Sequence, residues 1–295
     1  MEQGMRFAEI GQQLRAYRME SGLRAEEIAA RLGVSRAALY RYEKGEVIKL
    51  DTVKRLAELL KVSPLSLLGI GVEYYSRPTG YFERMRQIEE SADQLLKISG
   101  PFSYLTTSEA FDVSLAESLA EAARLPGVDR AAAQVSIDQV LTLLAARKRA
   151  YLQRKPGIIA LISAQAAGRF LETGVMGNFA LSASLRARNK VVARTEMERV
   201  ASQMETEPMG LQFGLLQVAE PTAEFVILRG RDRATLAVNP FYPDSMPLQQ
   251  TGVAMITGAD EAIVAHQRVA EALWRDALRG TAAAAAVRQM ITDRS

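Results

Sequence analysis

Two short amphipathic helices separated by a tight turn place the strongest constraint on the fold of this chain. The spacing of apolar residues predicts one helix over residues 25–32 and another over residues 36–44. Gly33 is expected to end the first helix, because a left-handed backbone favours glycine, and Ser35 is a good N-cap for the second. Ala29 is the small residue that lets the two helices approach each other. The segment therefore predicts two helices packed across a two-residue turn.

Three further helices are predicted around this pair. The first has an apolar face of residues spaced three and four apart, namely Phe7, Ile10, Leu14 and Tyr17. Asp51 is expected to cap a fourth helix, and Ser63-Pro64 opens a fifth, with proline where its missing N–H costs nothing. Residues 7–68 are therefore predicted to form an all-α unit of five helices.

The residues around the turn resemble the Cro-like, XRE-type helix-turn-helix family. The resemblance covers residues 7–68 and rests on four segments: Gly22-Leu23, Glu26-Glu27-Ile28-Ala29, Leu32-Gly33-Val34-Ser35-Arg36 and Tyr42-Glu43-Lys44-Gly45. It implies a five-helix, lambda-repressor-like DNA-binding domain over residues 1–71, and an ion pair between Arg18 and Glu43. The family usually has glutamine near the start of the second helix, where this chain has Ala25 preceded by Arg24.

The predicted recognition helix, residues 36–44, carries side chains suited to DNA. Arginine forms two parallel hydrogen bonds with the O6 and N7 atoms of guanine, so Arg36 and Arg41 are candidates for base contacts. Ala37 is expected to touch a thymine methyl, and Tyr40 a base edge or a phosphate. Contacts that position the phosphate backbone are expected from Arg24, Ser35, Lys44 and Lys49. The alternative is a surface helix of solvated arginines on a domain that binds a protein.

The net charge of +3 lies wholly in the same part of the chain. Residues 1–71 contain twelve basic and nine acidic residues, whereas residues 72–295 contain twenty-five of each. A basic excess of this kind favours a partner that carries phosphates, although the positions of the charges decide the question.

The remaining residues predict a second domain, as the length of 295 residues also indicates. Residues 72–98 are interpreted as a linker and a connecting helix over residues 81–98, which either joins two subunits or packs on the second domain. Residues 99–295 predict an α/β (α+β) sensor domain with four or five strands, including the apolar run 157–163 and a strand over residues 211–219. The order of its elements resembles the phospholipase-D-like and other sensor domains of transcription factors, and assigns no site residues.

Composition excludes several chemistries. A chain without cysteine has no disulfide, no cysteine-ligated metal and no thiol nucleophile. His266 is the only histidine, which excludes a multi-histidine metal site and the paired His-Lys-Asp motifs of a phospholipase D. We therefore expect no catalytic residues, no metal and no cofactor. The N-terminus lacks an apolar signal run, and the apolar stretches are too short to span a membrane, so a cytoplasmic protein without a membrane partner is expected.

Together these features predict a sequence-specific, DNA-binding transcriptional regulator, by default a repressor. We expect a homodimer on a pseudo-palindromic, double-stranded operator. The C-terminal domain is expected to sense a small-molecule effector, to dimerise, or both, with ligand-binding residues that the sequence does not identify. Two alternatives are a helix-turn-helix-linked enzyme domain with autoregulation and an antitoxin-like regulator that binds a protein.

Overall fold

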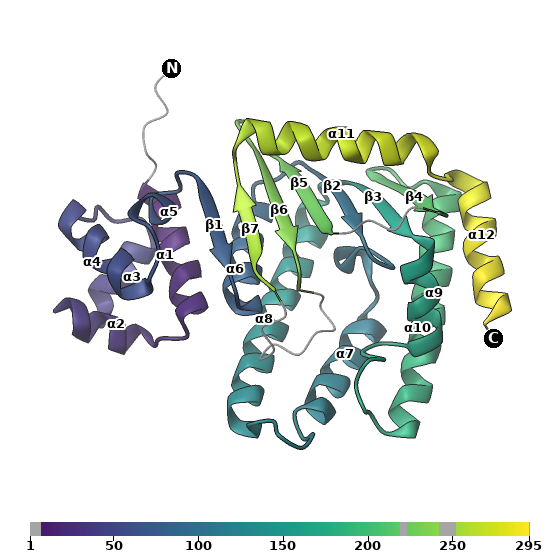
Figure 1. Cartoon of the computed structure of the whole chain (residues 1–295), viewed down its shortest axis with the longest axis horizontal. Coiled ribbons are helices and arrows are strands. Elements are labelled where there is room, and N and C mark those ends of the chain that lie inside the picture. Colours follow the sequence, from purple (N-terminus) through teal and green to yellow (C-terminus); the bar gives the residue numbers. More distant parts are fainter. Residues whose placement is uncertain (1–6, 219–222, 242–251, 295) are drawn as a thin grey trace.

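A small helical unit lies against a larger unit that is built on one β-sheet (Figure 1). The computed structural model describes residues 7–218, 223–241 and 252–294. The helical unit consists of α1 (Phe7–Ser21), α2 (Ala25–Leu32), α3 (Arg36–Glu43), α4 (Leu50–Leu60) and α5 (Pro64–Leu67). These five helices confirm the all-α fold that was predicted for residues 7–68.

The helix ends in this unit follow the capping residues of the sequence. Gly33 ends α2 in a left-handed backbone with φ of 70°, and Ser35 Oγ accepts a hydrogen bond from the Ala38 N–H at 3.1 Å to start α3. α4 differs from the expectation, because it begins one residue before the expected cap. Asp51 therefore lies in the first turn of α4, where its negative charge suits the helix dipole.

Glycine at position 11 lets α1 approach the end of α3. A Cβ atom at Gly11 would lie 2.5 Å from the carbonyl oxygen of Tyr42 and 2.7 Å from that of Glu43, so no larger residue fits without displacement. Leu14 and Tyr17, which share the apolar face of α1, are completely buried in the same core. The predicted face is thus buried at Ile10, Leu14 and Tyr17, and the side chain of Phe7 lies outside what the structure describes.

The larger unit contains a seven-stranded mixed sheet in the order β1-β7-β6-β5-β2-β3-β4. The strands are β1 (Val72–Tyr75), β2 (Gln94–Ser99), β3 (Gly157–Ser163), β4 (Leu211–Leu216), β5 (Glu224–Arg229), β6 (Ala234–Asn239) and β7 (Ala254–Thr257). β2, β3 and β4 run parallel, and the other neighbours pair antiparallel. The sheet is larger than the four or five strands expected. The expected strand over residues 211–219 ends at Leu216, and its last residue lies outside the described residues.

Helices cover both faces of this sheet. α11 (Asp260–Asp276) lies along one face (Figure 1) and buries Leu96, Leu161 and Ile227 beneath it. The larger core contains residues of α6 (Pro78–Glu89), the 3-10 helix η1 (Tyr104–Thr106), α7 (Glu109–Ala122), α8 (Arg130–Arg154), α9 (Ala164–Thr173), α10 (Ala183–Thr206) and α12 (Gly280–Asp293). Within the described ranges, no helix has both the length and the apolarity to cross a membrane.

The segment expected to be a linker and a connecting helix, residues 72–98, is part of the sheet domain. β1 pairs with β7 at one edge of the sheet, and β2 lies between β5 and β3. The expected helix over residues 81–98 therefore ends at Glu89, because the pairing of β2 with two neighbours favours a strand. Eleven of the twelve residues of α6 are buried, so this helix offers no free face for joining two subunits.

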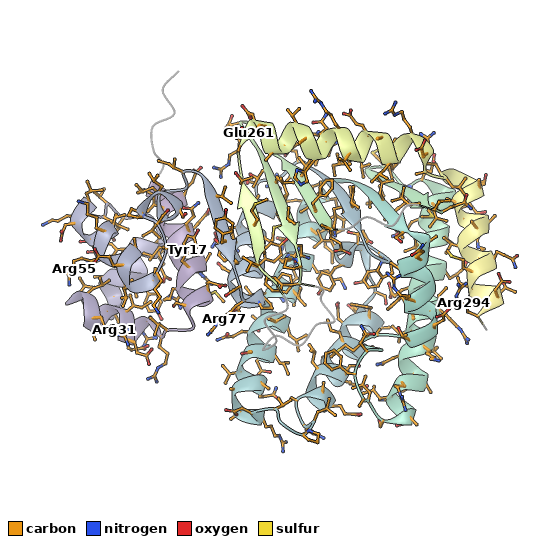
Figure 2. The ribbon with its side chains drawn as sticks, viewed as in Figure 1. Tyr17, Arg31, Arg55, Arg77, Glu261 and Arg294 are labelled. Atoms are coloured by element: carbon orange, nitrogen blue, oxygen red, sulfur yellow. The ribbon has the colours of Figure 1, made fainter. Side chains whose placement is uncertain are left out.

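α1 docks the helical unit onto β1 and α6. Tyr17, labelled at this junction in Figure 2, stacks on Tyr75 with 5.3 Å between ring centroids and an interplanar angle of 16°. The Glu20 carboxylate accepts hydrogen bonds from the backbone N–H groups of Ser76 at 2.6 Å and Arg77 at 3.0 Å. The stacked tyrosine rings and the hydrogen bonds of Glu20 hold the two units together.

Candidate nucleic-acid interface

α3 presents its predicted contact residues to solvent. The side chains of Ala38 and Leu39 point inward and are buried, which fixes the opposite side of the helix as the outer one. Four of the five predicted contacts on or beside this helix are exposed and Tyr40 is half-buried; the five are Arg36, Ala37, Tyr40, Arg41 and Lys44. The geometry leaves these residues accessible to a partner, and their contacts with DNA remain a prediction.

Arg36 is held by two neighbours at the start of α3. Its guanidinium Nη1 lies 2.7 Å from a carboxylate oxygen of Glu26 in α2, and its Nη2 donates to the Tyr40 hydroxyl at 3.2 Å. The Arg36 guanidinium carbon also lies 5.3 Å from the centroid of the Tyr40 ring. Arg36 and Tyr40 therefore act as one exposed group.

Arg41 is held in a similar way one turn later. Its Nε lies 3.1 Å from a carboxylate oxygen of Glu46, and both side chains are more than half exposed. Exposed ion pairs contribute about 0–1 kcal/mol, because water solvates both partners well. A phosphate or a guanine edge can therefore replace the carboxylate partner of Arg41 at little energetic cost.

The three predicted contacts that flank α3 are also exposed. Arg24 precedes α2 and donates from Nε to Glu27 Oε1 at 2.9 Å, while its backbone N–H donates to Glu27 Oε2 at 3.1 Å. These hydrogen bonds lower the pKa of Glu27. Ser35 uses its hydroxyl to cap α3, and Lys49 lies immediately before α4. The structure places all three at helix N-termini, where phosphate is favoured.

The predicted partners Arg18 and Glu43 meet between α1 and α3. Arg18 donates from Nε to Glu43 Oε1 at 2.5 Å and from Nη2 to Oε2 at 3.0 Å, which makes a bidentate pair. Burial lowers the pKa of Arg18, but the Glu43 carboxylate more than offsets this, so the pKa is raised. The pair fixes the end of α3 on α1.

Arg55 is a structural residue that sequence reasoning did not single out. Its guanidinium Nη2 donates to the carbonyl oxygen of Leu32 at 3.0 Å, at the C-terminal end of α2, where a cation suits the helix dipole. Figure 2 shows Arg55 and Arg31 on the side of the helical unit that faces away from the sheet. No local spacing signals this contact, because the two residues lie on different helices.

A second candidate site is a cavity of about 110 Å³ between β2, β5, α6 and α8. Its lining combines aromatic rings with four charged side chains, which are Glu89, Lys97, Arg147 and Glu224. Arg147 donates to Glu89 from Nε at 2.8 Å and from Nη2 at 2.7 Å, so these two neutralise each other. Sequence reasoning missed this site, because its residues come together only in the folded sheet.

His266 has a structural environment. Its Nδ1 lies 2.8 Å from the carbonyl oxygen of Ala262, and its ring meets Phe225 edge-on with 4.8 Å between centroids. Across the described parts of the chain, no group of three or more histidine or acidic side chains is arranged to hold a metal ion.

Comparison with known proteins agrees with this geometry. Residues 9–67 match the family described as "Helix-turn-helix domain". The N-terminal unit is an XRE-like helix-turn-helix domain. The chain is also similar to two archaeal proteins, each named "Putative HTH-type transcriptional regulatory protein". It is 33% identical over 123 residues to the one from Pyrococcus horikoshii and 32% identical over 131 residues to the one from Pyrococcus furiosus.

These matches cover only part of each protein. They span 38% and 41% of this chain, and 38% and 42% of the length of the two relatives. The similarity therefore supports the helix-turn-helix assignment and does not extend to the activity of the whole chain.

Proposed function

We propose that this chain is a sequence-specific, DNA-binding transcriptional regulator that acts in the cytoplasm and whose C-terminal domain senses a small molecule. One observation carries the DNA-binding part of the proposal: α3 of a helix-turn-helix domain projects Arg36 and Arg41 into solvent, with their only ion pairs among the described residues being weak surface pairs. The basic excess of the chain lies in the same domain.

The proposal includes a homodimer on a pseudo-palindromic operator. A single helix-turn-helix domain contacts few base pairs, and two domains on half-sites about one helical turn apart supply the affinity that specific binding requires. α6 is excluded as the dimer contact, since it is buried within one chain. Repression is the simplest outcome, because occupying a promoter requires no contact with another protein.

The sensing part of the proposal rests on the cavity and its position. α6 contributes Tyr81, Phe82, Met85 and Glu89 to the lining of the cavity, and packs on α1 of the helix-turn-helix domain. One helix thus connects a potential ligand site to the DNA-binding domain.

We propose that the chain acts by binding and not by catalysis. The carboxylates of Glu73 and Glu89 are buried, and each is paired with an arginine, Arg84 and Arg147 respectively. Carboxylates held in this way are poor general acids or bases, because both oxygens already accept charged hydrogen bonds.

Selection from a random double-stranded DNA library tests the DNA-binding function. The full chain should enrich a discrete sequence with two related halves. Arg36→Ala or Arg41→Ala should lower affinity for the enriched DNA about 10-fold or more, and affinity for unrelated DNA much less. Arg186→Ala, at an exposed position of the neutral sheet domain, is the matched control and should change neither. Equal losses on both DNAs would contradict base recognition by α3, and the absence of any enriched sequence would contradict the function itself.

A further inference from the structure

The cavity beside β2 contains a lysine in an unusual position. Lys97 lies in a strand with neighbours on both sides, directly opposite Ala160 of β3 and Val226 of β5. These two neighbours are 0% and 5% exposed, and Lys97 itself is half-buried in the middle of the sheet, where an apolar residue is the usual choice.

The Lys97 ammonium makes no hydrogen bond or ion pair with residues 7–218, 223–241 or 252–294. Arg147, the other cation of the cavity, is already neutralised by Glu89. Glu224 accepts a hydrogen bond from the Gly100 N–H, and its negative charge attracts Lys97. Burial lowers the pKa of Lys97, and the attraction of Glu224 offsets only part of this effect. An anion that pairs with a cation in this position stabilises it, and none of the described residues forms such a pair with Lys97.

We propose that the cavity binds a small monocarboxylate, whose carboxylate pairs with Lys97 and whose apolar part lies among Met85, Phe102 and Phe170. The cavity volume is about 110 Å³, smaller than the roughly 150 Å³ cavity known to hold benzene, so a short or branched acyl chain fits best. This inference names the ligand class for the proposed sensing function, and only its regulatory consequence rests on that function.

α6 links the occupied cavity to the helix-turn-helix domain. Phe82 and Met85 line the cavity, whereas other residues of the same helix contact α1. The Glu83 carboxylate lies 3.0 Å from Nε of Arg15, and Gln87 Nε2 donates to the carbonyl oxygen of Gln12 at 3.0 Å. A ligand that shifts the cavity side of α6 therefore also shifts α1 of the DNA-binding domain.

Calorimetric titration of the full chain, without DNA, tests the ligand class. Isobutyrate is compared with isobutyramide, a neutral molecule of nearly the same shape. Isobutyrate should bind about 10-fold or more tightly than the amide, because a charged hydrogen bond replaces a neutral one. Lys97→Met should reduce the affinity for isobutyrate to that for the amide. Lys190→Met, the same substitution at an exposed position of α10, should leave both affinities unchanged.

Three results would overturn the inference: no binding of isobutyrate up to about 10 mM, equal affinity for the acid and the amide, or full retention of isobutyrate binding by Lys97→Met. A thermal melt of each variant shows that it is folded. Because no DNA is present, these results are independent of whether α3 binds DNA. If the chain binds isobutyrate but enriches no DNA sequence, the ligand site is supported and the proposed DNA-binding function is contradicted.

Discussion

The buried carboxylate of Glu73 joins the two units of the chain. Loss of its charged partner Arg84 should lower the free energy of unfolding strongly. Glu73 Oε1 accepts from Arg84 Nη2 at 2.9 Å and from Gln13 Nε2 of α1 at 2.9 Å, and Oε2 accepts from Arg84 Nε at 2.9 Å and from the Tyr75 hydroxyl at 2.6 Å. The side chains of Glu73 and Arg84 are 8% and 6% exposed. Burial lowers the pKa of Arg84, but Glu73 more than offsets this, so the pKa is raised.

Arg84→Met should therefore lower the free energy of unfolding by about 3–5 kcal/mol, the usual cost of leaving one partner of a buried pair without its countercharge. Glu73→Gln should cost a similar amount, for the same reason. The double variant should cost much less than the sum, because it buries no lone charge, which gives a coupling energy of roughly 2–3 kcal/mol. Urea unfolding of the full chain, followed by circular dichroism, measures each term.

Arg154→Met provides the matched control for this cycle. Arg154 pairs with Asp93 at 3.3 Å, and the two side chains are 44% and 54% exposed, so its loss should cost less than about 1 kcal/mol. The buried pair does not stabilise the chain in the way described if Arg84→Met costs no more than Arg154→Met, or if the two single effects at positions 73 and 84 simply add.

Three further variants test other parts of the structure. Lys97→Met should raise the free energy of unfolding at pH 7 by on the order of 1 kcal/mol, since it removes a half-buried cation that has no ion pair with the described residues. The pKa of Lys97 is lowered in the folded state, so the unfolded wild-type chain binds more protons above that pKa. The extra stability of Lys97→Met over the wild type should therefore shrink as pH rises towards about 10.4. A constant or growing stability difference in a pH series of urea melts would contradict the lowered pKa of Lys97. Glu43→Gln should lower the free energy of unfolding by about 1–3 kcal/mol, because the Arg18 guanidinium loses its charged partner, and an unchanged urea midpoint would show that the pair is not stabilising. Gly11→Ala should lower the melting temperature markedly, as its Cβ would lie 2.5 Å from the Tyr42 carbonyl oxygen; wild-type melting would mean that α1 and α3 are less closely packed than described.

The helix-turn-helix domain was predictable because its signals are local. Gly33 and Ser35 are two residues apart and fix the turn by their own backbone and hydroxyl chemistry, independent of the rest of the chain. The exposed face of α3 follows from the same spacing, since Leu39 must point inward. The contacts of Arg36 with Glu26 were not predicted, because they join two helices whose crossing angle the sequence does not specify.

The start of the sheet domain was not predictable in the same way. β1 is a strand because it pairs with β7, which lies far along the chain, and residues 72–75 alone show only a short run near turn-forming residues. β2 contains adjacent leucines that suit a helix face as well as a buried strand. Only the folded sheet, with Lys97 paired opposite Ala160 and Val226, shows that Lys97 lines the cavity. The cavity is therefore a property of the folded sheet.

The absence of cysteine allows the most direct test of the central claim, that α3 binds DNA in a dimer. A single cysteine introduced as Ala37→Cys, at an exposed position of α3, is coupled to a DNA-cleaving iron chelate and mixed with the selected DNA. We expect cleavage at two positions about one helical turn apart. The same chelate on Ala187→Cys, exposed on α10, should not cleave at defined positions. Cleavage from position 187 that equals cleavage from position 37, or none from position 37 on DNA that the protein binds, would contradict DNA binding by α3.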